Sequence, residues 1–222
     1  MQPKVVSKTL TAASANCIAL SQSVAAGAKA IINGASATAG AFTLDTQRRV
    51  VIVSAANDAA NTAHIYGQRG TGQAINEILA LTNAGTAVST LDYFSGGTVT
   101  FPTGTAGAIT IGTNTTGSTD WAMPNFHLTP FSLAVAIENT TTATTYSVEF
   151  TQDPYWYATQ SASQTTPGFN VGTIIGGATL AAAAGTIANT ATVTSPVTGY
   201  RLTINAGTTT VTMQATQAGI IN

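Results

Sequence analysis

The residue types that could perform acid–base chemistry are few and widely spaced in this sequence. Glu149 and Asp153 form the most suggestive pair, because glycoside hydrolysis needs two carboxylates about 5–9.5 Å apart. Four residues of extended strand, at roughly 3.3 Å each, would separate them by about 13 Å unless the chain bends at Asp153-Pro154. The spacing therefore favours a solvated strand end followed by a turn.

The sequence offers equally few candidate residues for a nucleophilic catalytic site. Asp58 and His64 could begin a catalytic triad, but they are loop residues six positions apart with no identified nucleophile, which favours ordinary surface groups. Cys17 is the only cysteine, and a small buried hydrophobe is its favoured interpretation because no histidine lies nearby in sequence. Glycine-rich phosphate-binding and nucleophile-elbow motifs are missing. We therefore expect a protein that is not an enzyme.

Metal binding is also disfavoured by the residue types. Two histidines, His64 and His127, and one cysteine exclude His-rich and tetrahedral zinc patterns. Asn57-Asp58 and Asp120 could offer oxygen ligands to calcium, but neither cluster holds more than one carboxylate. We expect no cofactor and no metal.

One aromatic cluster is a candidate interaction site. Tyr155, Trp156 and Tyr157 follow one another directly. Exposed, they would form a carbohydrate-stacking or protein-binding patch; buried, they would fill a domain core or a subunit contact, which is the favoured interpretation.

The charge content narrows the possible partners. Only 7% of the 222 residues are Asp, Glu, Lys or Arg and the formal net charge is −1, against roughly 25% charged residues in ordinary soluble domains. Such a chain has no clustered basic surface for nucleic acid or an anionic membrane. An almost uncharged polar surface suits permanent assembly with other subunits.

The segments that would position these residues have the sequence pattern of short β-strands. Phe131, Leu133, Val135 and Ile137 alternate with smaller residues, and the continuous apolar run 50–53 is typical of a strand buried on both faces. Segment 73–81 fits helical spacing and a strand face alike, and we favour a strand. Alternation at residues 99–101 and 109–111 predicts a hairpin, and Asn205-Ala206-Gly207 has the turn chemistry that closes hairpins.

The predicted fold is all-β, with two β-sandwich domains of jelly-roll or immunoglobulin-like type and an extended N-terminal arm. The segment 112–120, uncharged until its last residue Asp120, is the best boundary, which gives an arm with first strands at 1–39, a domain at 40–115 and a second domain at 116–222. The N-terminus lacks the apolar run of a secretory signal, so we expect synthesis in the cytoplasm. Segment 171–188 is uncharged but rich in glycine and threonine, which favours loop and strand over a membrane span.

Two segments of the sequence resemble a known class of proteins. The first, RRVVIVSAANDAANTAHIYGQRGTGQAINEILALTNAGTAVSTLDYFSGGTVTFPTGTAGAITIGTN, resembles a recurrent module of tailed-bacteriophage structural proteins, with S-A-x-N-D, G-x-x-x-x-E, an N-A-G turn and a closing I-G-T. The second, YSVEFTQDPYWYA followed by SPVTGYRLTINAGTTTVTMQATQAG, is similar to another phage virion module. Together they cover most of residues 40–222. Residues 76–79 are more aliphatic than the Thr-rich equivalent.

The resemblance implies a virion structural protein, assembled in the host cytoplasm. Our first expectation is a head decoration or cement protein that bridges major capsid protein subunits and contacts copies of itself. The alternatives are a tail or head-to-tail connector component, separated from it by copy number, or a carbohydrate-binding receptor module that uses Trp156. Within the arm, Val5, Val6 and Leu10 could add a strand to a neighbour's sheet edge. Arg201 matches a module position and is expected to bind a carboxylate or carbonyl at a domain or subunit contact.

Overall fold

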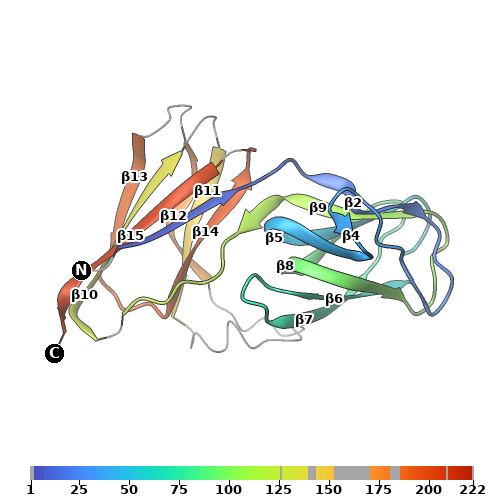
Figure 1. Ribbon diagram of the computed structural model, residues 1–222, viewed down its shortest axis with the longest axis horizontal. Coiled ribbons are helices and arrows are strands. Elements are labelled where there is room, and N and C mark those ends of the chain that lie inside the picture. Colours follow the sequence, from blue (N-terminus) through green and yellow to red (C-terminus); the bar gives the residue numbers. More distant parts are fainter. Residues whose placement is uncertain are drawn as a thin grey trace. The chain divides into compact units, whose positions relative to one another are not determined.

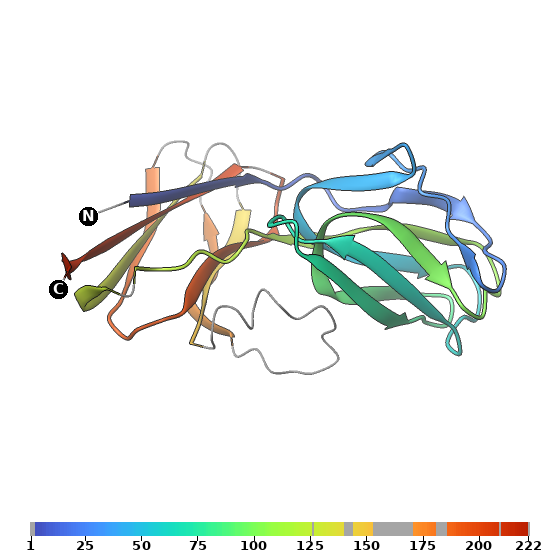
Figure 2. The same cartoon turned by 60° about the horizontal axis from the view of Figure 1, so that its bottom comes forward.

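A computed structural model describes residues 3–125, 127–139, 144–152, 171–180, 186–208 and 210–221. The fold is all-β, and these residues form strands and connecting loops without any helix. The chain divides into two compact units. The N-terminal unit comprises residues 13–115, and the C-terminal unit comprises the described residues of 3–12 and 116–221. Figures 1 and 2 show the strands of each unit.

The N-terminal unit is built on one curved sheet in which β9, β5, β8, β6 and β7 follow one another. β2 pairs with β9, β3 with β8 and β4 with β5. The long strand β8 pairs with β5 through residues 86–96 and with β6 through residues 95–100. Shifts of register along β5 bend the sheet, as β-bulges do. The strands are β2 (Ser14–Gln22), β3 (Ala28–Lys29), β4 (Ala37–Thr38), β5 (Ala41–Ser54), β6 (Thr62–Gln68), β7 (Ala74–Ala80), β8 (Thr86–Phe101) and β9 (Ile109–Ser118).

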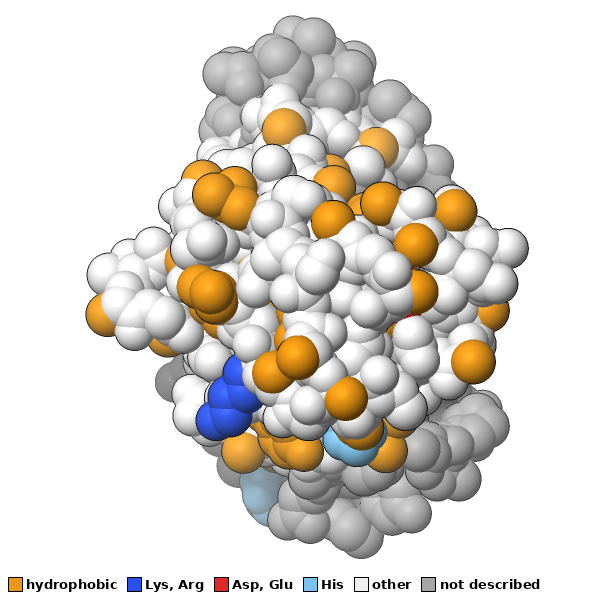
Figure 3. Space-filling model, turned by 90° about the vertical axis from the view of Figure 1, so that its right-hand side faces the viewer, with side chains coloured by type: hydrophobic (Ala, Val, Ile, Leu, Met, Phe, Trp, Pro, Cys, Tyr) orange, Lys and Arg blue, Asp and Glu red, His pale blue; other side chains and the backbone are white. Residues whose placement is uncertain are grey.

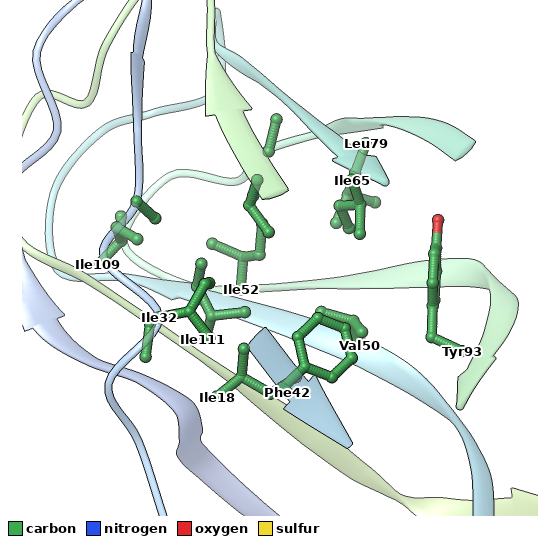
Figure 4. Packing of buried hydrophobic residues seen from close by; sticks show 14 of the residues in the cluster. Ile18, Ile32, Phe42, Val50, Ile52, Ile65, Leu79, Tyr93, Ile109 and Ile111 are labelled. Carbon is green, nitrogen blue, oxygen red and sulfur yellow. The ribbon is translucent and has the colours of Figure 1, made fainter. Parts of the chain in front are cut away.

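The core of this unit lies against the inner face of the curved sheet. Figure 4 shows buried side chains from several strands of this unit packed in one cluster, among them Ile18, Phe42, Ile52, Ile65 and Ile111. Val50 and Val51 are both buried although they are neighbours on β5, which confirms the prediction of a strand covered on both faces. The core therefore holds strands from both ends of the unit's sequence together.

The C-terminal unit is a sandwich of two sheets. One sheet has the order β1-β15-β10-β13, and the other has the order β12-β11-β14 with the last residues of β9 beside β14. The inward side chains of both sheets form one apolar cluster, which is the arrangement of a β-sandwich. The strands are β1 (Pro3–Thr9), β10 (Leu128–Asn139), β11 (Thr144–Thr151), β12 (Val171–Leu180), β13 (Thr186–Val193), β14 (Gly199–Ala206) and β15 (Thr210–Ile221).

Alternation along the strands explains which side chains reach this cluster. Leu133, Val135 and Ile137 on β10 are almost completely buried, whereas Ala134 between them is exposed. A strand directs successive side chains to opposite faces, so one apolar row suffices to build each half of the core. The facing row includes Val148, Leu202 and Ile204.

Two predicted hairpins are wrong, although their strands exist. β5 lies between β8 and β9 in the sheet, so residues 99–101 do not pair with residues 109–111. β14 and β15 belong to different sheets, and the turn at Gly207, whose φ is +106°, therefore carries the chain from one sheet to the other. Alternation identifies strands from local sequence, but pairing depends on distant segments.

The N-terminal segment 1–39 is divided between the two units. β1 pairs with β15 from Pro3↔Thr216 to Thr9↔Thr210, and Leu10 is buried in the C-terminal unit's core. Residues 13–39 belong to the N-terminal unit, where Ile18 is completely buried. The boundary between the two units after residue 115 lies inside the segment 112–120. The strand prediction for residues 73–81 is confirmed by β7.

Candidate functional site

The carboxylate of Asp58 is completely buried in the loop that follows β5. It accepts hydrogen bonds from the Ser54 hydroxyl, from Nδ2 of Asn61 at 2.7 Å and from the backbone N–H of Ala106 at 2.6 Å. Its three donors come from the end of β5, from the loop after it and from the loop before β9. Asp58 therefore ties the end of β5 and the loop after it to the loop before β9, beside the backbone hydrogen bond from the Ala55 N–H to the Ala108 carbonyl at 3.0 Å.

These hydrogen bonds also set the ionisation of Asp58. Burial by itself would raise the pKa of the carboxyl, because water no longer solvates the charge. The donors Ser54, Ala106 and Asn61 favour the charged form, and the pKa of Asp58 is lowered below its ordinary value of 3.8. The group is an ionised anchor rather than a proton donor at neutral pH.

His64 is not among the hydrogen-bonding partners of Asp58. It lies on β6, in register with Ile78 of β7 and Thr100 of β8, while the Ser54 hydroxyl donates directly to the Asp58 carboxylate. A triad would need the imidazole between hydroxyl and carboxylate. The geometry supports a structural role for both Ser54 and Asp58.

The calcium candidates Asn57, Asp58 and Asp120 are likewise engaged within the fold. Oδ1 of Asn57 accepts the backbone N–H of Ala59 at 3.3 Å, and Asp58 is enclosed as described. Within the described residues, no three His, Cys, Asp or Glu side chains gather where they could hold a metal ion.

Arg201 forms the second polar cluster, in the C-terminal unit. It lies opposite Glu149 in the register of β11 and β14, and its Nε donates to Oε2 of Glu149 at 2.7 Å. Its guanidinium carbon is 4.7 Å from the centre of the Trp121 ring, a cation–π distance. The sequence predicted a carboxylate or carbonyl partner at a domain or subunit contact; here Glu149 supplies the carboxylate within one unit.

The carboxylate of Glu149 is thus already bound by a cation. Asp153, the second carboxylate of the pair considered in the sequence, lies outside the described residues. The aromatic candidates Tyr155, Trp156 and Tyr157 also lie outside the described residues. Their role therefore stays a prediction from sequence.

The three arm residues have different surroundings on and beside β1. The Val5 side chain is 59% exposed, Val6 packs partly against the core and Leu10 is buried. Hydroxyl pairs add to the backbone ladder, with Ser7 and Thr212 oxygens 3.0 Å apart and Thr9 and Thr210 oxygens 2.7 Å apart. Val5 is thus the arm residue most open to a partner.

Two ionisable residues of structural importance were not predicted from the sequence. Arg48 is buried beside Asp45, with Nη1 3.5 Å from Oδ1, and desolvation lowers its pKa although the aspartate opposes the shift. Arg48 has the same parity along the strand as the core residues Val50 and Ile52, which was the available signal.

Glu77 is the second such residue, on the inner face of β7. Its carboxylate accepts from the Thr90 amide at 2.7 Å, the Thr90 hydroxyl at 2.9 Å and the Leu91 amide at 3.2 Å. Burial, and secondarily the charge of Glu77, raises the pKa of the nearby Tyr93 phenol. No local pattern in the sequence could indicate this partner, because β7 and β8 follow one another in the chain but each pairs with β6 and not with the other.

The predicted burial of Cys17 is confirmed. Its thiol lies in the N-terminal core, with Sγ 3.7 Å from Oγ1 of Thr113. A buried thiol of this kind behaves as a small hydrophobe.

The surface combines isolated apolar side chains with neutral polar ones. Figure 3 shows one face on which hydrophobic groups are scattered among neutral atoms and few basic side chains appear. Exposed large apolar residues include Ile31, Ile78 and Met123. Across the described part of the chain, no helix is long and apolar enough to cross a membrane.

The comparisons with protein families and with curated proteins identify no relative of this chain. No protein-family model matches the chain, and no curated protein matches it.

Proposed function

We propose that this protein is a non-enzymatic structural component of a tailed-bacteriophage particle, and that it acts as a head decoration or cement protein. The observation that carries the proposal is how the ionisable residues are used. Asp58, Arg201, Glu149 and Glu77 are engaged in bonds within their own unit, while only 7% of the sequence is charged. These side chains stabilise the fold of the unit to which each belongs.

A nearly neutral surface suits contacts that are permanent and many times repeated. Desolvating a charge costs far more than desolvating a hydroxyl or an amide, so neutral surfaces can be buried without matched ion pairs. On a symmetric shell each weak contact recurs in every subunit, and avidity supplies the hold. The partners in this proposal are the major capsid protein and further copies of this chain.

The edge strand β1 is the proposed docking element. It pairs with β15 on one side and stands at the end of its sheet. Its outer backbone edge can accept a strand from a neighbour, with exposed Val5 as the side-chain contact. This differs from the arm predicted by sequence, which donates its own strand to a neighbour.

The proposal is tested by adding the purified protein to particles that lack it and measuring occupancy. Deleting residues 1–9 removes the edge strand while it keeps Leu10 in the core. We expect this variant to stay folded by circular dichroism and to lose particle binding. The matched control is Val5→Thr, which keeps the edge strand and should bind with reduced affinity.

Two results would contradict the proposal. Full occupancy by the folded deletion variant would show that β1 is not part of the interface. Failure of the wild-type protein to bind any part of the particle would reject the structural role altogether. Binding confined to the tail would instead support the alternative in which this protein is a tail component.

A further inference from the structure

The sequence contains one Asn-Gly dipeptide, Asn33-Gly34. This pair is prone to spontaneous deamidation, because glycine has no side chain to shield its backbone nitrogen. The Gly34 nitrogen, having lost its proton, attacks Cγ of Asn33; a C–N bond closes a five-membered succinimide and ammonia leaves. Water then opens the ring at one of its two carbonyls, which gives aspartate or isoaspartate.

The fold requires both residues of this pair. A Cβ atom on Gly34 would lie 2.3 Å from the carbonyl carbon and the oxygen of Cys17, so any side chain here collides with the backbone of β2. Oδ1 of Asn33 accepts the backbone N–H of Leu20 at 2.9 Å and takes the place of a backbone carbonyl. Packing therefore requires glycine at position 34, and hydrogen bonding requires asparagine at position 33.

The same contacts restrain the two atoms that must react. The Gly34 N–H donates to the Ile18 carbonyl at 2.9 Å, which holds the proton that the reaction must remove. The Leu20 amide holds the side chain that carries the electrophilic carbon. The nitrogen cannot approach Cγ while both hydrogen bonds persist.

A neighbouring side chain closes the segment further. Nε2 of Gln22 donates to the Ile31 carbonyl at 2.9 Å, and Oε1 of Gln22 accepts the Ile31 N–H at 2.8 Å. This double contact lies at the exposed end of β2, while Ala30 and Ile32 of the same segment are buried in the core, so that separating residues 30–34 from β2 requires a local opening of the fold.

From these contacts we infer that Asn33 is a latent modification site, at which succinimide formation is suppressed while residues 30–34 stay bound to β2 and proceeds when they separate. Isoaspartate would insert a methylene group into the main chain between Asn33 and Gly34. Gly34 could then no longer fit against Cys17, so the opened segment would not return to its native pairing. The inference does not depend on the proposed function.

The first experiment compares the folded protein with the protein in guanidinium chloride at the same mildly alkaline pH. Peptide mapping by mass spectrometry follows conversion of the Asn33 amide to a carboxylate. If reaction requires opening, we expect conversion in the folded protein to be at least about 100-fold slower. Rates that agree within about threefold would overturn the inference.

A pair of variants tests the mechanism in the folded state. Gln22→Ala removes both bonds to Ile31 without touching the reacting residues, and we expect conversion at Asn33 to become about tenfold faster. Gln214→Ala, an exposed glutamine on β15, is the matched control and should leave the rate unchanged. An unchanged rate in folded Gln22→Ala would contradict the inference. If that variant does not fold, the comparison of folded and unfolded wild-type protein decides alone.

Discussion

Asp58 holds its three donors through an ionised carboxylate in a site that excludes water. Asp58→Asn removes the charge and replaces one acceptor oxygen by a donor, which would either face the Asn61 and Ala106 donors or oblige the Ser54 hydroxyl to accept where it now donates. We expect the free energy of unfolding to fall by about 2 kcal/mol in urea titrations. Glu138→Gln, at a partly exposed carboxylate on β10, is the control and should change it little. A loss for Asp58→Asn no larger than the control would contradict the anchoring role.

The lowered pKa of Asp58 gives a second prediction at the residue scale. Because the native pKa lies below the unfolded value, the native state binds fewer protons in acid, so the stabilisation is complete above the unfolded pKa of about 3.9. It is lost as the pH falls through the native pKa. We expect the wild-type protein to lose more stability than Asp58→Asn as urea titrations move from neutral pH to below about pH 3. Parallel curves for the two proteins would contradict this.

Arg201 makes a planar contact that lysine cannot reproduce. Arg201→Lys keeps the charge but removes the Nε bond to Glu149 and the flat stacking on Trp121. Both partners of the ion pair are about one-fifth exposed, so we expect a loss of only about 1 kcal/mol. A double-mutant cycle with Glu149→Gln measures the coupling, and a coupling of zero would assign the loss to Trp121 alone.

At the element scale, β7 and β8 are joined by a side chain instead of a backbone ladder. Glu77 occupies the Thr90 and Leu91 amides, which would otherwise be free to pair with another strand. Glu77→Ala should lower the free energy of unfolding by about 2 kcal/mol and speed hydrogen exchange at these two amides. Exposed Ile78→Thr on the same strand is the control. Unchanged exchange at Thr90 would contradict the role of Glu77.

The strands were predictable where their residues alternate, as at Leu133 to Ile137, because burial on one face is a local property of sequence. Their partners were not, as the wrong pairing of residues 99–101 with residues 109–111 shows. β5 is inserted between these strands by the shape of the core, which no short segment encodes. The Glu77 contact was unpredictable because β7 and β8, although consecutive in the chain, pair with β6 and not with each other.

For the polar sites too, the sequence indicated some of the residues but not their partners. The sequence singled out Asp58 and Arg201, but it could not identify Ala106 or Trp121 as their partners. Ala106 reaches Asp58 from the loop before β9, and Trp121 reaches Arg201 from the segment after β9. Both contacts join distant segments, so only the folded chain reveals what the side chains do.

At the scale of the whole molecule, the low charge content has a measurable consequence. Association through neutral surfaces involves few ion pairs, so salt has little to screen. We expect the occupancy of the protein on particles to change less than about twofold between low and physiological salt. Particles incubated at several salt concentrations and sedimented would give the bound fraction. A steep loss of binding with salt would contradict a neutral interface.

The central claim, that this chain is a repeated structural subunit of a virus particle, is tested most directly by its copy number. Quantitative mass spectrometry of purified particles, against the major capsid protein as internal standard, measures that number. The decoration role predicts hundreds of copies per particle. Absence of the chain from intact particles, together with a freely soluble monomer that turns over a substrate, would contradict the claim.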